Sequence, residues 1–112
     1  MWSVEVEPEV ERWIESLSVK DFAKVVAAVE RLAEDGNRLR FPASRALGDG
    51  LFELRISLDR VARRITFCFA ENRRIVLLTT FRKQRQNERA EVRRARRAMR
   101  RCLAEGHAAE EE

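Results

Sequence analysis

Hydrophobic residues recur at two different spacings, which divide the chain into a helical half and a strand-rich half. Residues 2–6 alternate apolar and polar side chains, which predicts a short strand. After Pro8 the apolar residues return every three or four positions, which predicts two helices. Pro8 suits the first turn of a helix because its missing N–H costs nothing there. Ser18 and Asp21 resemble a capping box that starts the second helix, and Gly36 suits its end.

In the second half the spacing changes to two. Residues 37–50 contain Pro42 and two glycines and predict a loop. Three strands joined by tight turns are predicted next, at residues 52–58, 61–69 and 75–81. The last of these is apolar on both faces, as expected of a central strand covered on both sides. A basic helix is predicted at about residues 87–103.

The predicted order of elements is β-α-α-β-β-β-α, which indicates an α+β domain with an antiparallel sheet. The two N-terminal helices are expected on one sheet face, and the other face is expected to be at least partly open. Residues 1–105 are predicted to form a single domain. Residues 106–112 are predicted to be a disordered acidic tail.

Charge is distributed unevenly along the chain. There are 23 Lys and Arg against 19 Asp and Glu, a net charge of +4. Residues 1–35 contain four bases and nine acids, a net of −5, whereas residues 81–101 contain ten bases and two acids, a net of +8. A field of this kind suits capture of a polyanion or of an acidic protein segment.

Several classes of chemistry are excluded by the residues that are missing. The one histidine, His107, lies in the tail, so neither a Ser-His-Asp nor a Cys-His arrangement is available. No metal-ligand pattern is present, and neither a metal nor another cofactor is expected. Cys68 and Cys102 are expected to be reduced thiols, with a disulfide between them as the alternative. No membrane-length apolar run and no signal peptide is found, so a cytoplasmic location is predicted.

Two arginines on neighbouring predicted strands indicate a binding site. If Asp59 and Arg60 form a two-residue turn, Arg55 and Arg64 are direct cross-strand neighbours on the face away from the helices. Like charges in that position are destabilising unless an anion lies between them. The pair therefore predicts an anion site on the sheet.

Other cations are expected to converge on the same surface. Arg82 and Lys83 lie where the third of these strands ends, and Arg45 lies in the preceding loop. The alternative is a solvated sheet face held by salt bridges, with Glu53 as the structural partner of Arg55.

Three segments resemble the RelE/HigB toxin superfamily in its phage-derived branch, and the resemblance covers nearly the whole chain in order. The segment 47–55, LGDGLFELR, resembles that family's L-G-x-G-L-[YF]-E-L-R. The segment 64–69, RITFCF, is similar to its Arg-then-apolar strand, and 75–83, IVLLTTFRK, is similar to its I-V-L-L-x-x-F-x-K strand. The chain departs from the family at the start of the last helix, where Glu88-Arg89 replaces Thr-Pro.

The resemblance implies a RelE-like fold and the toxin of a type II toxin–antitoxin system, generally a ribosome-dependent mRNA endonuclease. By the same resemblance, Arg55, Arg64 and Lys83 match positions that bind or activate the scissile phosphate, and Arg45 matches a basic loop position. We predict that Arg45, Arg82, Arg85 and Arg89 bind nucleic acid. Lys83 lies between Arg82 and Arg85, and this crowding by like charge is expected to fit it for acid–base catalysis.

The resemblance also implies partners. These are a cognate antitoxin of the helix-turn-helix, HigA-like kind, mRNA on the ribosome, and DNA only through the antitoxin complex. Two alternatives to the nuclease stay open. One is a non-catalytic basic module that binds nucleic acid or an acidic partner, and the other is a C-terminal helix that reads DNA.

Overall fold

The computed structural model describes the backbone of residues 1–111 and the side chains of residues 1–105. In chain order the elements are β1 (Ser3–Val6), α1 (Pro8–Glu15), α2 (Val19–Asp35), the 3-10 helix η1 (Gly36–Arg38), β2 (Ser44–Gly48), β3 (Leu51–Leu58), β4 (Val61–Ala70), β5 (Arg74–Arg82) and α3 (Glu88–Glu111). The predicted elements are all present in the predicted order, and the predicted α+β class is confirmed.

The sheet has the strand order β1-β5-β4-β3-β2. The meander of β3, β4 and β5 is antiparallel as predicted. The two-residue turn between β3 and β4 has positive φ at both residues, and the three-residue turn between β4 and β5 has positive φ at Asn72 and Arg73. Two expectations were wrong. β1 pairs in parallel with β5, so the sheet is mixed, and the predicted loop at 37–50 contains β2, which pairs with β3.

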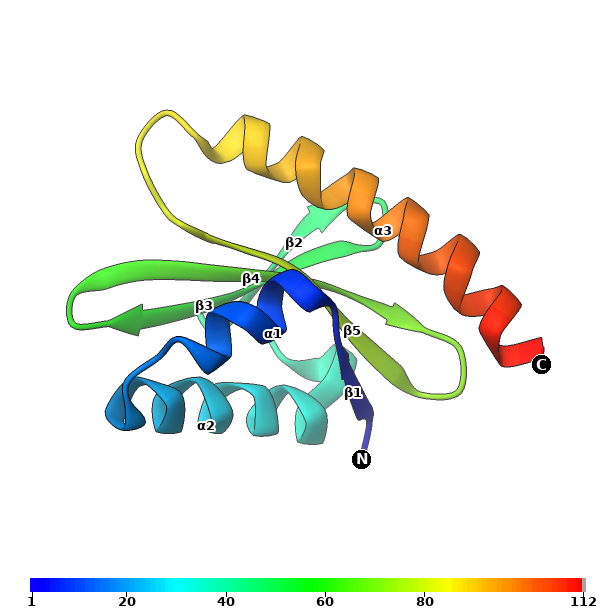
Figure 1. Ribbon diagram of the computed structural model, residues 1–112, viewed down its shortest axis with the longest axis horizontal. Helices are drawn as coiled ribbons and strands as arrows, with labels where there is room; N and C mark the ends of the chain where they lie inside the picture. The colour runs from blue at the N-terminus through cyan, green and yellow to red at the C-terminus, as the bar shows by residue number, and fades with distance from the viewer. Residues whose placement is uncertain (112) are drawn as a thin grey trace.

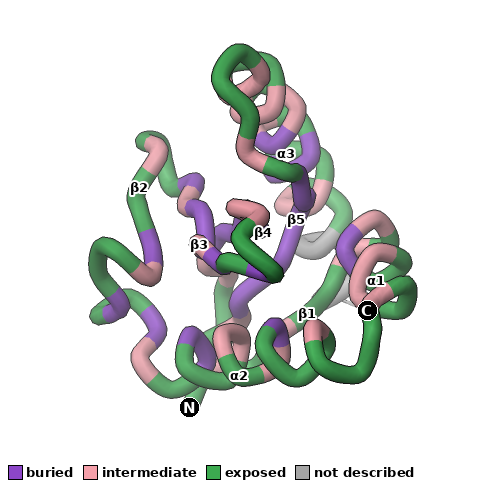
Figure 2. Tube along the Cα trace, turned by 90° about the vertical axis from the view of Figure 1, so that its left-hand side faces the viewer, coloured by how far each residue is buried: buried purple, intermediate pink, exposed green. Residues whose placement is uncertain are grey.

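The helices lie on both sides of this sheet (Figure 1), with α1 and α2 against one face and α3 across the other. The larger core lies beneath α1 and α2 and includes Val25, Leu32, Leu54, Ile65, Phe67 and Leu77. A second core lies beneath α3 and consists of Leu51, Cys68, Val76, Leu78, Ala95, Ala98 and Met99. The buried stretches of the chain therefore concentrate in the strands between the two helical layers (Figure 2).

The predicted helix signals act locally as expected. The Ser18 hydroxyl accepts a hydrogen bond from the backbone N–H of Asp21 at 3.2 Å, so Ser18 caps α2. Gly36 ends that helix with φ of +54°. A Cβ at Gly36 would lie 2.0 Å from the indole nitrogen of Trp2, so glycine also allows this close approach.

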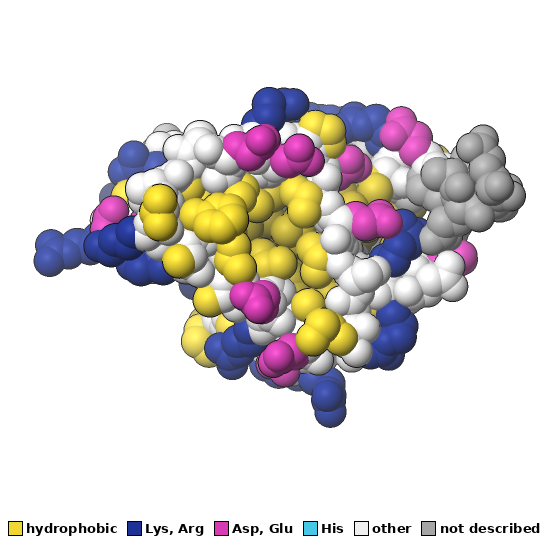
Figure 3. Space-filling model, turned by 60° about the horizontal axis from the view of Figure 1, so that its bottom comes forward, with side chains coloured by type: hydrophobic (Ala, Val, Ile, Leu, Met, Phe, Trp, Pro, Cys, Tyr) yellow, Lys and Arg dark blue, Asp and Glu magenta, His cyan; other side chains and the backbone are white. Residues whose placement is uncertain are grey.

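The surface beside α2 has an apolar centre with charged side chains around it (Figure 3). On the side where α2 lies, hydrophobic side chains gather in a hollow bordered by acidic ones, with Lys and Arg mainly at the periphery (Figure 3). The partly buried apolar side chains in α1, in α2 and between them are Trp13, Ile14, Leu17, Ala28 and Val29.

The last helix is longer than the sequence indicated. α3 continues to Glu111, beyond the predicted end near Leu103. The side chains of 106–111 and the whole of residue 112 lie outside the described residues. The domain boundary at 105 and the disorder of 106–112 therefore stay predictions.

Candidate anion-binding site on the charged half of the sheet

The predicted cross-strand pair is present. Arg55 on β3 lies directly opposite Arg64 on β4, and the turn at Asp59 and Arg60 sets this register. Cross-strand partners share a sheet face. The neighbouring row brings Arg45 of β2 opposite Glu53. We call this part of the sheet face the charged half. It consists of Arg45, Glu53, Arg55, Arg64 and, after the end of β5, Lys83.

Arg64 is buried, contrary to the expectation of an exposed guanidinium. Its side chain is 6% exposed, and its Nε lies 3.5 Å from the carboxylate of Glu53, which is 0% exposed. Glu53 is therefore the partner of Arg64 and not, as predicted, of Arg55. Burial lowers the pKa of Arg64, and the Glu53 carboxylate acts in the opposite direction. A guanidinium nonetheless keeps its charge in proteins, so Arg64 is a fixed positive charge beneath the surface.

Arg55 is only half-buried, and its guanidinium lies over the ring of Phe41 at 4.7 Å from the ring centroid. Its backbone N–H donates to the carbonyl of Ala43 at 2.9 Å, which ties β3 to the loop before β2. Arg55 also weakens the proton affinity of Arg64 by like charge, so the two guanidinium groups lie within electrostatic reach of each other.

Lys83 forms an ion pair instead of being crowded by other bases. Its Nζ donates to Oε2 of Glu88 at 3.0 Å, and Arg45 lies 3.9 Å from Oε1 of the same carboxylate. The hydrogen bond from Lys83 holds the pKa of Glu88 below its usual range, and the charges of Arg45 and Arg64 add to this effect. The Glu88 carboxylate thus lies among three cations, in the place that an anionic ligand would occupy.

The turn between β5 and α3 holds this ion pair in place. Asn87 accepts a hydrogen bond from the backbone N–H of Gln84 at 3.0 Å and donates to the carbonyl of Arg82 at 3.1 Å. Its own carbonyl accepts the N–H of Glu91, which starts the helix. Asn87 therefore fixes Lys83 and Glu88 on the two sides of one tight turn.

Arg82 is the predicted contact that the structure separates from the rest. β5 has a bulge that places Thr79 opposite Thr66 but Leu77 opposite Phe67. The extra residue reverses the alternation, so that Phe81 pairs with Arg64 and Arg82 pairs with Arg63 on the other face. Arg85 and Arg89 are exposed in the turn and the first turn of α3.

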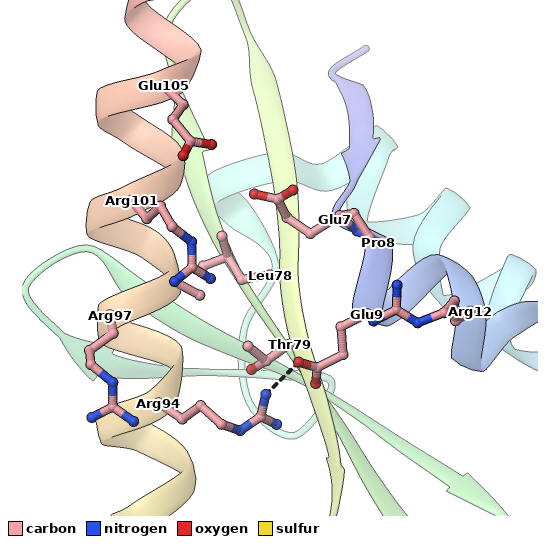
Figure 4. Close-up of a pocket in the computed structure, with 11 residues that line it drawn as sticks. Glu7, Pro8, Glu9, Arg12, Leu78, Thr79, Arg94, Arg97, Arg101 and Glu105 are labelled. Carbon is pink, nitrogen blue, oxygen red and sulfur yellow. Dashed lines mark hydrogen bonds and ion pairs between the residues drawn. The ribbon is translucent and has the colours of Figure 1, made fainter.

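A second charged cluster, not foreseen from the sequence, joins α1 to α3. The carboxylate of Glu9 is hydrogen-bonded by Arg94 (Figure 4). It also accepts the backbone N–H of Thr80 at 3.0 Å. Arg94 also donates to Glu91 at 2.9 Å. Glu9 and Arg94 border a cavity of about 400 Å³ between the helices. Since the carboxylates of Glu9 and Glu91 both pair with Arg94, we assign this cluster to the attachment of α3.

Sequence reasoning missed the role of Glu88 and of Asn87. Glu88 was noticed only as a departure from the family pattern. The available signal was its position five residues after Lys83, in the first turn of a predicted helix, where carboxylates are favoured.

Cys68 and Cys102 are free thiols, and burial raises their pKa to about 11 and about 12, which leaves them protonated and unreactive. Within residues 1–105, no group of His, Cys, Asp and Glu is arranged to hold a metal ion. No helix in the described part of the chain is long and apolar enough to cross a membrane.

Comparison with solved structures supports the fold. The chain is similar to a chain of the intact E. coli RelBE toxin–antitoxin complex, with a TM-score of 0.58, 10% identity, and coverage of 76% of this chain and 100% of that one. It is equally similar to the isolated E. coli RelE toxin, with a TM-score of 0.58, 10% identity, and coverage of 84% and 97%.

Among curated proteins, none matches this sequence. The sequence profile of the family described as "Phage derived protein Gp49-like (DUF891)" matches residues 12–102, which is most of the chain. That match and the RelE-like fold confirm the resemblance seen in the sequence. The chain belongs to the Gp49-like family of phage-derived proteins, and its fold is that of the RelE toxin.

Proposed function

We propose that this protein is the toxin of a type II toxin–antitoxin system and that it cleaves mRNA on the ribosome without a metal ion. Family membership and the fold shared with E. coli RelE support the toxin assignment. The observation that carries the nuclease proposal is the Lys83–Glu88 ion pair, with Arg45 and the buried Arg64 as neighbouring charges. It provides an unprotonated base and a protonated acid side by side.

In the proposed mechanism the scissile phosphate takes the place that the Glu88 carboxylate occupies between Lys83 and Arg45. The ribose 2′-oxygen attacks phosphorus while Glu88 takes the 2′-hydroxyl proton. The bond to the 5′-oxygen breaks, and Lys83 gives its proton to that oxygen. The products are a 2′,3′-cyclic phosphate and a 5′-hydroxyl. After the products leave, the Glu88–Lys83 contact forms again and the proton passes from Glu88 to Lys83, which restores both groups.

The arginines stabilise the negative charge that develops on the phosphate. Arg45 and Arg55 are accessible and suited to contact phosphate oxygens, because a planar guanidinium can donate two parallel hydrogen bonds. Arg64 acts from beneath as a charge held in place by Glu53. Fixed charge aimed at a developing oxyanion is usually the largest catalytic contribution.

The proposed partners are a HigA-like antitoxin with a helix-turn-helix domain, mRNA on the ribosome, and DNA through the antitoxin complex. The solved structure that this fold resembles is of a toxin–antitoxin complex, which supports an antitoxin as a partner. Arg85 and Arg89, exposed beside the site, are proposed to contact the RNA backbone.

A non-catalytic binding module is the second candidate, and the burial of Arg64 favours it. A guanidinium paired with a buried carboxylate serves the fold whether or not RNA is cut. The partly exposed ion pair of Lys83 and Glu88 separates the two candidates. Because such a pair contributes little to stability, its removal changes the cleavage rate if the protein is a nuclease and leaves the fold intact in either case.

The test uses Lys83→Ala, Glu88→Gln and, as a control, Lys24→Ala on the exposed surface of α2. Purified variants are incubated with translating ribosomes, and cleaved mRNA ends are mapped. We expect each site variant to lower the cleavage rate by about 10²-fold or more, while Lys24→Ala cleaves like the wild type. Wild-type rates in both site variants would rule out Lys83 and Glu88 as the catalytic pair. A wild-type protein that produced no cleaved ends above background would favour the binding module.

A further inference from the structure

A groove with an unusual lining lies beside the charged half of the sheet, at its β2 edge. It has a volume of about 440 Å³ and is formed by the end of α2, η1, the loop before β2 and one residue of β3. The lining contains four arginines and one aspartate, namely Arg31, Arg38, Arg40, Arg55 and Asp35. Four positive charges against one negative charge leave a net of +3. The groove is therefore an electrostatic trap for an anionic chain.

Most of this positive charge is not neutralised by the protein. Asp35 lies 3.7 Å from Arg31 and offsets that one guanidinium. Arg40 donates to the backbone carbonyl of Asn37 at 3.0 Å, which is a neutral acceptor. Arg38 is exposed to solvent. Phosphate groups are the partners that exposed guanidinium groups favour.

Phe41 is the second unusual feature. Its side chain is 67% exposed, and it lies at the groove together with Pro42. A ring this exposed contributes little to a hydrophobic core. The guanidinium of Arg55 stacks on it at 4.7 Å, and most of the remaining ring surface faces solvent. An exposed aromatic ring among unpaired arginines is the arrangement with which proteins hold single-stranded nucleic acid.

Arg55 connects the groove to the charged half. It stacks on Phe41 and is also the cross-strand neighbour of Arg64. The groove and the charged half therefore both lie within the reach of the Arg55 side chain. A strand with its phosphate at Lys83 and Arg45 would continue past Arg55 towards Phe41.

We propose that Phe41 stacks against a nucleobase of the bound RNA strand, and that Arg38 and Arg40 hold the phosphates that flank this base. The identity of the ligand rests on the proposed function. The stack would position the strand without reading its sequence, since every base has a π-face. Phe41 is thus a binding residue for the substrate and takes no part in the chemical step.

Binding is measured separately from cleavage, with a fluorescein-labelled 2′-O-methyl RNA octamer. This probe lacks the free 2′-hydroxyl and cannot be cut by the proposed mechanism. We expect Phe41→Ala to raise its Kd about tenfold, equivalent to about 1.4 kcal/mol, and Phe41→Trp to leave it unchanged or lower it. The octamer should also quench the new indole of Phe41→Trp beyond any quenching of Trp2 and Trp13 in the wild type.

The matched control is Phe22→Ala, which removes a ring that is 45% exposed on α2. It should bind the octamer like the wild type. A wild-type Kd in Phe41→Ala would overturn the stacking proposal, even if that variant bound an antitoxin less well. A protein that holds the octamer through Phe41 but cuts no RNA would overturn the nuclease function and leave this binding site standing.

Discussion

The face of the sheet that meets α3 has two halves built from the same three strands. In one half Leu51, Cys68 and Val76 lie under the helix and are buried in the second core. In the other half β3 and β4 present Arg55 and Arg64, and Lys83 follows the end of β5. The side chains thus change from apolar to charged along β3 and β4, while the face stays the same.

The difference between the halves is set by where the helix crosses. Ala95 and Ala98 allow α3 to approach the apolar half closely, and Met99 fills the remaining space. The turn held by Asn87 precedes the helix, so α3 does not cover the sheet at this point. Arg45, Lys83 and Glu88 lie on the face there instead. One half therefore provides packing, and the other provides unbalanced charge around a single exposed carboxylate.

The largest effect should come from breaking the buried ion pair of the charged half. Glu53→Ala leaves the charge of Arg64 buried without a partner, which we expect to cost roughly 3–5 kcal/mol of unfolding free energy. The double variant Glu53→Met/Arg64→Met replaces the pair by packing groups and should be at least as stable as the wild type. Urea unfolding measures both.

The same double variant tests the function of Arg64. If the buried guanidinium stabilises charge on the phosphate, the stable double variant should cleave RNA about tenfold more slowly or worse. A folded double variant that cleaves at the wild-type rate would show that Arg64 serves the fold alone.

Shortening a side chain in the apolar half should lower stability without changing the cleavage rate, the opposite of the result expected for the Glu53 and Arg64 double variant. Leu78 is 2% exposed and lies in the second core, so Leu78→Ala should cost roughly 2–5 kcal/mol of stability. Because it touches none of the charged residues of the site, cleavage per folded molecule should be unchanged at low temperature. A large fall in rate without unfolding would mean that the two halves are coupled.

The sequence predicted this face more accurately than it predicted the site. The alternation in β3 and β4 and the two-residue turn place Arg55 opposite Arg64 without ambiguity, because a shift of one residue would expose the core. The strand β2 was missed because Ser44-Arg45-Ala46-Leu47-Gly48 has no apolar alternation and follows a proline. This edge strand forms because it pairs with β3, and that pairing leaves no signal in its own sequence.

The errors in the site have a physical cause as well. β5 is apolar on both faces, so its sequence contains no signal of the bulge that turns Arg82 away. The pairing of Arg64 with Glu53, and of Lys83 with Glu88, depends on side-chain directions that a pattern of charges does not specify. Sequence placed Arg55 and Arg64 on the correct face, but it could not predict which of the cations are neutralised.

A smaller effect should follow from loosening the turn between the halves. Asn87→Ala removes a hydrogen bond to Gln84 and another to Arg82, and loss of one such hydrogen bond costs about 1 kcal/mol. Lys83 and Glu88 would then be held less well, so we expect the cleavage rate to fall more than the affinity for the 2′-O-methyl octamer. Asn87→Asp keeps an acceptor for the Gln84 N–H and should recover part of the rate.

The smallest effect is the dependence of stability on pH. The pKa of Glu88 is lowered by the hydrogen bond from Lys83, so the carboxylate stabilises the fold above its unfolded pKa. This contribution is lost as the pH falls through the lower, folded pKa. Wild type should therefore exceed Glu88→Gln slightly in urea midpoint at pH 7, and the two should converge in acid below the usual carboxyl range. Because Glu88 is partly exposed, 0.5 M salt should also narrow the gap at pH 7. A gap that stayed constant with pH and salt would mean that Glu88 contributes through packing and not through its charge among the three cations.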